Sequence, residues 1–172
     1  MSGHNSREPS QHAHIGASIR DRLVSRHNRP VESWRVKEAV NALNLSTAVG
    51  VAVAVAGRAR LVRGPRGLLL ATGYRLGLPK APAFTVGNVV LTRHDEEWLA
   101  ERPRLLRHEE RHTWQYTACL GLPMLPLYLV AAGWSWLRGG DAGTHNVFER
   151  AAGLADGGYP VVSARRRRRR AA

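Results

Sequence analysis

Two histidines and a glutamate lie close together in the segment RHEERH: His108, Glu109 and His112. In a helix, residues four positions apart share one face, so both imidazoles can reach the same metal ion. Glu109 follows the first histidine, where its carboxylate can reach a water molecule on that metal. Zinc lowers the pKa of bound water toward about 7, and a neighbouring carboxylate can then accept its proton. The segment therefore predicts a zinc site with His108 and His112 as ligands and Glu109 as general base.

A catalytic zinc site also needs a third protein ligand and one open position. The downstream candidates are Asp141, His145, Glu149 and Asp156. We favour Glu149, because it lies in the stretch NVFERAA, which predicts a second helix. His145 precedes that stretch and remains the alternative ligand. Glu149 also stands three residues after Asn146, where it can complete a helix capping box, a role that is compatible with metal binding.

Several polar residues near the motif are weaker candidates. Gln115 lies three residues after the second histidine, near the metal-facing side of the helix, where it can orient a ligand. Asp141 and Asp156 are alternatives for accepting the outer N–H of a zinc-bound histidine. Tyr116 and Tyr128 can donate to an oxyanion, although packing in the core is the simpler expectation for both.

Two helices must position these residues. Pro103 suits the first position of a helix, which is expected to pass through the histidine motif until Gly121 and Pro123 end it. A second helix is expected from about Asn146 to Gly157.

The rest of the pattern is less distinctive. The β-branched residues of FTVGNVVL at 84–91 predict a single strand. A helix is expected at 67–78 and a partly helical segment at 18–44. The apolar run at 45–57 fits either a strand or a helix.

Residues 117–137 contain no charged side chain, and this stretch is long enough to suggest a transmembrane helix. Pro123 and Pro126 split it, however, and leave a segment that is short for a bilayer span. We therefore expect a buried or interfacial segment, with membrane insertion as the alternative. Trp134 and Trp136 fit either a protein core or a lipid interface.

The charge is unevenly distributed along the chain. The formal net charge is +13, and six consecutive arginines occupy positions 165–170. Such a run can bind the phosphates of nucleic acid or an anionic lipid surface, and without a partner it is expected to stay unfolded. Composition predicts a disordered arm at 1–17, one domain at 18–162 and a disordered tail at 163–172.

The chain has one cysteine, Cys119, so no disulfide partner is expected. We expect this thiol to act as a small buried hydrophobe. The first thirty residues contain no apolar segment of the kind found in signal peptides. A cytoplasmic location is therefore expected, with membrane association as the alternative.

HEERH followed by the helical stretch NVFERAAGLAD resembles the zincin metallopeptidases, in the gluzincin-like arrangement of H-E-x-x-H with a downstream glutamate. The resemblance covers roughly residues 84–158. It implies that His108, His112 and Glu149 bind zinc and that Glu109 is the general base. It also implies that the strand at 84–91 borders the cleft and pairs with substrate backbone.

A narrower resemblance is to small uncharacterised bacterial proteins with three short motifs. These motifs are H-E-x-x-H-x-x-Q-Y, L-P-x-Y and N-x-F-E, and they match residues 108–116, 125–128 and 146–149. This second resemblance implies no known substrate.

Together these features predict a mainly helical α+β domain of the zincin-like kind. A helix with His108, Glu109 and His112 is expected to pack against a helix with Glu149, beside a short sheet. We expect a zinc-dependent hydrolase that resembles metallopeptidases, uses one Zn²⁺ per chain and acts on a peptide or protein. The alternative is a non-catalytic, metal-stabilised module that binds an anionic membrane surface or nucleic acid through arginine-rich segments.

Overall fold

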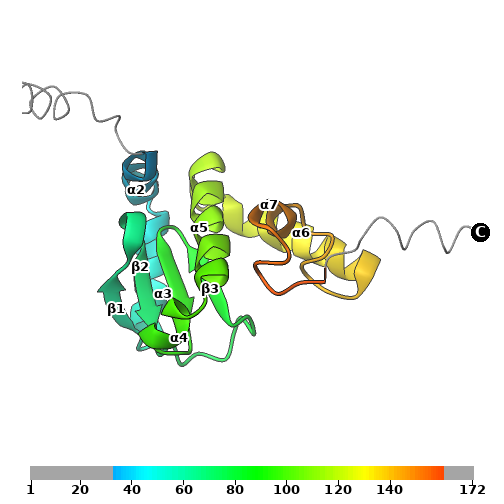
Figure 1. The fold of residues 1–172 in the computed structure, drawn as a ribbon. Helices are drawn as coiled ribbons and strands as arrows, with labels where there is room; N and C mark the ends of the chain where they lie inside the picture. The colour runs from blue at the N-terminus through cyan, green and yellow to red at the C-terminus, as the bar shows by residue number, and fades with distance from the viewer. Residues whose placement is uncertain (1–32, 161–172) are drawn as a thin grey trace, which may run out of the picture. The chain divides into compact units, whose positions relative to one another are not determined.

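The computed structural model describes residues 33–160 (Figure 1). The arm expected at 1–17 and the tail expected at 163–172 lie outside these residues, as does the beginning of the domain expected at 18–162. The described part of the chain is α+β and mainly helical, as the sequence predicts.

The described residues form six α-helices, four strands and one short 3-10 turn. The helices are α2 (Ser33–Leu43), α3 (Ser46–Ala56), α4 (Glu96–Ala100), α5 (Pro103–Ala118), α6 (Met124–Gly139) and α7 (Val147–Ala152). The strands are β1 (Arg60–Arg63), β2 (Leu69–Thr72), β3 (Ala83–Val86) and β4 (Val89–Thr92), and the 3-10 turn η1 spans Pro65–Gly67.

The four strands form one sheet in the order β1-β2-β4-β3. β2 and β4 are parallel, and the two outer pairs are antiparallel. β3 and β4 form a hairpin in which Val86 pairs with Val89 across Gly87 and Asn88. The single strand predicted at 84–91 is therefore wrong. Gly87 has a φ of 62°, which a glycine adopts without strain, and the chain reverses there.

The helix predicted at 67–78 is also wrong, because this segment contains β2. Leu70 and Ala71 are buried in two different clusters, on opposite faces of the sheet. A strand that is covered on both faces has no polar alternation, so its pattern cannot be distinguished from that of a buried helix.

The apolar run at 45–57 forms α3, which lies on the sheet. Gly50 permits this close approach, since a Cβ there would lie 2.3 Å from the carbonyl oxygen of Val86. α3, Val89 and Leu91 contribute to one hydrophobic cluster, which Tyr116 joins from the last part of α5. Cys119 is partly buried against this cluster, close to the expectation for it.

The second cluster covers the other face of the sheet. It contains Leu70, Val90 and Leu99, and Leu105 packs against it from the first part of α5. The two ends of α5 therefore contact opposite clusters, and the helix packs along β3, the outermost strand on its side of the sheet. Its middle section, with the histidine motif, lies beside that strand (Figure 1).

A buried amide network fixes α2 against α5. Asn41 is completely buried, and its Nδ2 donates to Asn88 Oδ1 at 2.9 Å and to the carbonyl oxygen of Thr113 at 2.8 Å. Thr117 Oγ1 donates to Asn41 Oδ1 at 3.1 Å. Since a buried amide without partners is costly, this network specifies one position for α5 relative to the hairpin.

The helices around the site agree with the sequence prediction in part. α5 starts at Pro103 and ends at Ala118, as expected. α7 is shorter than expected, because Gly153 with a φ of 94° ends it far ahead of Gly157.

The uncharged segment at 117–137 contributes most of α6. Pro126 lies in the first turn of this helix, where its missing N–H is not needed, so it does not break the helix. Among residues 33–160, no helix alone is both long and apolar enough to cross a membrane. α2 and α3 meet that requirement only when taken together, and they are bent by 73° at their junction.

Candidate metal centre

Four ionisable side chains are buried at one place between α5 and α7. The exposed fractions are 2% for His108, 3% for Glu109, 7% for His112 and 3% for Glu149. Removing charged groups from water is expensive unless they are paired or bind a metal, so such a cluster marks a functional site. His108, His112 and Glu149 offer ligand atoms that all lie within 4.8 Å of one another.

The separations between these atoms fit a single metal ion. His108 Nε2 lies 3.1 Å from His112 Nε2 and 3.0 Å from Glu149 Oε2, and His112 Nε2 lies 3.5 Å from Glu149 Oε1. Ligand atoms on a tetrahedral zinc at 2.0–2.1 Å are about 3.3 Å apart. The contacts of the two histidines with each other and with the two Glu149 oxygens are thus close to the separations that a small tetrahedral ion requires.

Hydrogen bonds to the outer ring nitrogens determine which nitrogen faces the centre. His108 Nδ1 lies 3.1 Å from the carbonyl oxygen of Gly153, and His112 Nδ1 lies 2.8 Å from Gln115 Oε1. The Gln115 amide is oriented by its Nε2, which donates to the carbonyl oxygen of Phe148 at 2.9 Å. Because both oxygens can only accept, both Nδ1 atoms carry the proton.

When both rings are neutral, as metal ligands must be, their Nε2 atoms therefore both present lone pairs toward the same point. Two lone pairs 3.1 Å apart repel each other unless a proton or a metal ion lies between them. Glu149 Oε2 is buried and makes no hydrogen bond of acceptable geometry, although His108 Nε2 lies nearby. This unpaired carboxylate oxygen is the second observation that fits a cation at the centre.

Glu149 is held in its charged form. Burial alone would raise the pKa of Glu149, but the adjacent His108 and His112 rings and the Tyr128 hydroxyl lower this pKa far more, well below its usual range. Tyr128 OH donates to Glu149 Oε1. The same environment raises the pKa of Tyr128, chiefly through burial and then through the charge of Glu149, so this phenol stays a donor.

Glu109 lies beside the centre and has a different partner. Its Oε2 accepts a hydrogen bond from Thr85 Oγ1 on β3 at 2.8 Å. Burial raises the pKa of Glu109, and the charge of His112 and the Thr85 hydrogen bond offset only part of that effect. A carboxylate with a raised pKa is a better proton acceptor, which suits a general base near neutral pH.

A cavity of about 240 Å³ opens onto these groups. Glu109, both histidines and Glu149 form its polar end, and the other walls are mainly apolar: Ala83, Phe84, Leu105, Met124, Leu125 and Leu129. Phe84 and Thr85 belong to β3, so this strand borders the cavity as the sequence predicts.

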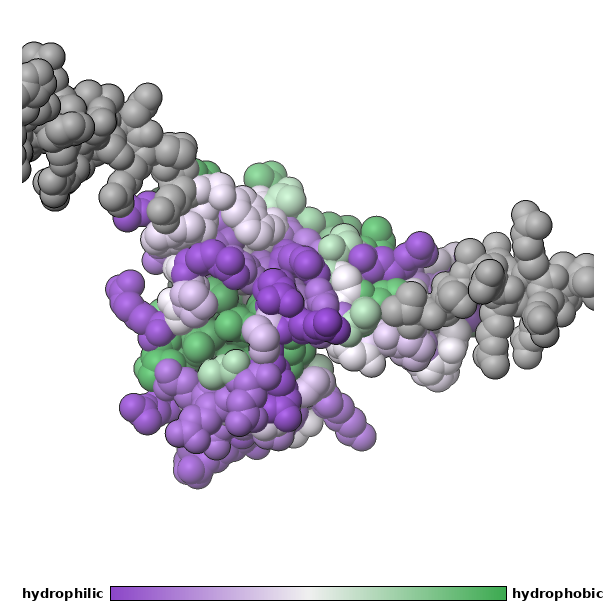
Figure 2. All heavy atoms as spheres, viewed as in Figure 1, coloured by the Kyte–Doolittle hydropathy of each residue, from purple (hydrophilic) through white to green (hydrophobic). Residues whose placement is uncertain are grey.

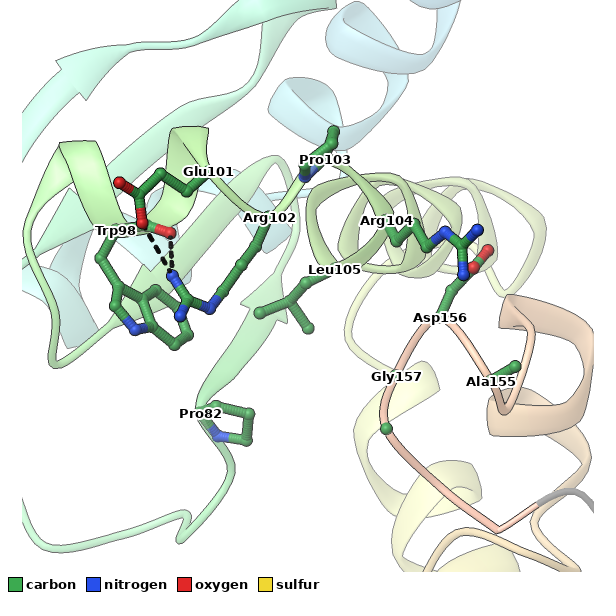
Figure 3. A pocket seen from close by; sticks show the side chains of 11 residues that line it. Pro82, Trp98, Glu101, Arg102, Pro103, Arg104, Leu105, Ala155, Asp156 and Gly157 are labelled. Carbon is green, nitrogen blue, oxygen red and sulfur yellow. Dashed lines mark hydrogen bonds and ion pairs between the residues drawn. The ribbon is translucent and has the colours of Figure 1, made fainter.

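A shallower hollow adjoins the cavity, and Pro82, Leu105 and Gly157 line both (Figure 3). At its far side the guanidinium of Arg102 lies over the ring of Trp98, 4.1 Å from the ring centre. The cavity and the shallower hollow therefore share part of their walls.

The other predicted candidates lie elsewhere. His145 is outside the cluster of ligand atoms, and its ring lies against Gly139. The role expected for Asp141 or Asp156 is wrong, since Gly153 and Gln115 accept from the histidines. Asp141 instead accepts from the backbone of Gly143 and Thr144, and Asp156 pairs with Arg111.

Two further expectations can be compared with the structure. Asn146 caps α7 as predicted, with its side chain accepting from the backbone of Phe148, but Glu149 turns toward the histidines. Tyr116 is buried and its OH donates to the carbonyl oxygen of Thr85 at 3.3 Å, in keeping with the core role expected for it.

The charged residues within the histidine motif connect it to its surroundings. Glu110 pairs with Arg66 of η1. Arg111 donates to the carbonyl oxygen of Ala152 and pairs with Asp156 at 2.9 Å. Arg111 therefore holds the end of α7 in place, next to the Gly153 carbonyl that orients His108.

Thr85 and Gly157 are site residues that the sequence analysis missed. A Cβ on Gly157 would lie 2.5 Å from His108 Cε1, so only glycine fits against that ring. The sequence shows this glycine as an expected helix end, but its contact with His108 depends on tertiary structure.

No protein-family model, curated protein or solved structure matches this chain.

Proposed function

We propose that this chain is a zinc-dependent hydrolase with His108, His112 and Glu149 as metal ligands. The observation that carries the proposal is the convergence of two histidine Nε2 atoms and the buried Glu149 carboxylate on one place, with ligand atoms that all lie within 4.8 Å of one another. Three protein ligands would leave a bound zinc with a position for water, as a catalytic zinc requires, and the cavity opens onto these three residues.

The residues around this point support a role for each in hydrolysis. Zinc, when bound, would supply a Lewis acid that lowers the pKa of a water molecule and polarises a carbonyl group. Glu109 would accept the proton from the attacking water and later pass it to the leaving group. Thr85 would hold the Glu109 carboxylate in position through its hydroxyl.

A peptide is the substrate class that the cavity wall favours. Among residues 33–160, β3 has a strand partner, β4, on one side only; α5 packs against β3, and Phe84 and Thr85 of this strand line the cavity. An extended peptide can add to such an edge through backbone hydrogen bonds. The apolar walls would accept an apolar side chain next to the bond that is cut.

The first experiment measures bound metal. The full chain is stripped with a chelator, supplied with zinc, desalted and examined by elemental analysis. We expect one zinc per chain, retained in Glu109→Gln and strongly reduced in His108→Ala and Glu149→Ala. His145→Ala is the matched control, because His145 lies outside the cluster and should leave the zinc content unchanged. Absence of zinc from the unaltered protein would reject the proposal.

The second experiment measures hydrolysis with a library of internally quenched peptides. Cleavage that requires zinc and disappears in Glu109→Gln, while this variant keeps its zinc, supports the assigned base. A protein that binds one zinc but cleaves no member of the library would instead favour the non-catalytic, metal-stabilised module.

A further inference from the structure

The outer side of α6 is apolar along almost its whole length. Met124 and Ser135 are the buried residues of this helix. The large side chains exposed to solvent are all apolar up to Arg138: Leu125, Leu127, Leu129, Val130, Trp134, Trp136 and Leu137. The exposed fractions reach 73% at Val130 and 75% at Leu137. We call these seven residues the α6 face.

A surface helix in contact with water normally presents polar residues on its outer side. The α6 face has none, and Figure 2 shows hydrophobic residues at the surface in this part of the molecule. Apolar patches of this kind mark sites where a membrane or a partner covers the surface.

The residue types of α6 fit a lipid interface. Leucine and valine occupy the first half of the face, and Trp134 and Trp136 follow near the end. Arg138 comes next, with its guanidinium 5.2 Å from the Trp134 ring centre. Tryptophan prefers the boundary between lipid headgroups and acyl chains, and an adjacent arginine can reach lipid phosphates.

The distribution of positive charge points to the same partner. Tyr159 lines the cavity together with Tyr128 of α6. The six arginines at 165–170 begin six residues later, so extended chain would put the first of them, Arg165, at most about 20 Å from Tyr159 and the last, Arg170, at most about 40 Å. An apolar helix with a nearby polybasic run supplies the two signals that stable binding to an anionic membrane surface requires.

We propose that the α6 face docks on an anionic phospholipid bilayer, with the arginine run strengthening this contact. α6 has 16 residues and is therefore about 24 Å long, which is shorter than the hydrocarbon core of a bilayer. It would thus lie in the plane of the interface. Leu125 and Leu129 belong to the face and also line the cavity, so the cavity would open next to the bilayer.

Two other occupants fit the observations less well. Nucleic acid would use the arginines but would leave the apolar face uncovered. A second copy of the chain would cover the face, but two chains of net charge +13 repel each other.

The test is co-sedimentation of the full chain with vesicles. Vesicles of phosphatidylcholine alone are compared with vesicles that contain one third phosphatidylglycerol. The double variant Val130→Glu, Leu137→Glu changes only exposed side chains. Leu61→Glu, on β1 at the sheet edge remote from β3, is the control. A third variant has serine in place of all six arginines at 165–170.

We expect binding to the anionic vesicles that falls at least tenfold in the double variant and is unchanged in Leu61→Glu. The serine variant should bind anionic vesicles more weakly than the unaltered protein, because its formal net charge falls from +13 to +7 while the apolar contact remains. Unchanged binding in the double variant would overturn the proposal and leave adsorption by the arginines alone. Failure to bind vesicles would also overturn the proposal. In that case sedimentation velocity would show whether a second copy covers the face, and binding of a DNA duplex would show whether nucleic acid is the partner of the arginines.

This result is independent of the proposed hydrolase function. His108 lies outside the α6 face, so the His108→Ala variant should bind vesicles as the unaltered protein does. Loss of zinc binding with intact vesicle binding, or the reverse, would therefore show which of the two proposals fails.

Discussion

His112 Nδ1 and Gln115 Oε1 lie 2.8 Å apart on successive turns of α5, and this contact directs His112 Nε2 toward His108 Nε2. Gln115 is itself fixed, because its Nε2 donates to the carbonyl oxygen of Phe148 on α7. The orientation of one predicted ligand is thus determined jointly by both helices of the site.

Replacing Gln115 should weaken zinc binding without abolishing it. In Gln115→Ala the His112 ring loses the acceptor that fixes its tautomer and orientation, and such losses reduce metal affinity about 10- to 100-fold. Competition with a chromophoric chelator measures the affinity. Arg107→Ala, an exposed change on the same helix, serves as the control. Equal affinities in the two variants would show that Gln115 does not orient the ligand.

Tyr128→Phe should destabilise the zinc-free protein by about 2 kcal/mol, because the buried Glu149 carboxylate loses a hydrogen bond donor. With zinc bound the loss should be smaller, since the metal then compensates the charge of Glu149. Urea denaturation with excess chelator and with excess zinc measures both values. Tyr116→Phe provides the comparison, because its hydroxyl donates to a backbone carbonyl and its effect should not depend on zinc.

Gly157→Ala should disturb the site through sterics alone. The added Cβ would lie 2.5 Å from His108 Cε1, so the ring has to move from its present position. We expect at least a tenfold loss of zinc affinity by chelator competition. Gly77→Ala is the matched control, since a Cβ there meets no atom within 4 Å. A Gly157→Ala variant with unaltered affinity would argue against the observed position of His108.

The pH dependence of stability should contain a contribution from Lys37, which is fully buried and donates to the carbonyl oxygen of Arg66 at 3.2 Å. Burial lowers the pKa of Lys37, and the charge of Glu110 opposes this only in part. Between that lowered pKa and the ordinary value of 10.5, the unfolded chain binds more protons. The free energy of unfolding should therefore rise with pH in this range.

Lys37→Met should remove that rise and should stabilise the protein by about 1 kcal/mol at pH 7, because no charge has to be buried. Urea denaturation at several pH values measures both effects. Lys80→Met, at an exposed lysine, should change neither. If the free energy of unfolding still rises with pH in Lys37→Met, the rise comes from another titratable group.

Local pattern predicted the central part of the site. His108 and His112 share a face because any helix places residues four positions apart together, and Pro103 marked the start of that helix. Glu149 was selected among four candidates, and the structure places its carboxylate next to both histidines. The pairing of the two histidines depends only on spacing within α5, whereas the position of Glu149 beside them depends on how α7 packs against α5.

The sheet was predicted less well, for a physical reason. β2 is covered on both faces, so its residues show no alternation and fit a helix equally well. The reversal at Gly87 divides one apolar stretch into two strands, and a glycine within such a stretch does not by itself show whether the chain turns or continues.

The amino-acid sequence by itself determined which side chains can do chemistry, the helix that carries the histidine pair, and the absence of charge from most of α6. Tertiary structure alone decided what surrounds them. Thr85, the Gly153 carbonyl and Gly157 reach the histidine motif from segments that are far from it along the chain, and the separation of Gly157 from His108 is 157 minus 108, or 49 positions. Helical spacing is a local property, whereas hydrogen bonds across elements and the exposure of a helix face depend on how those elements pack.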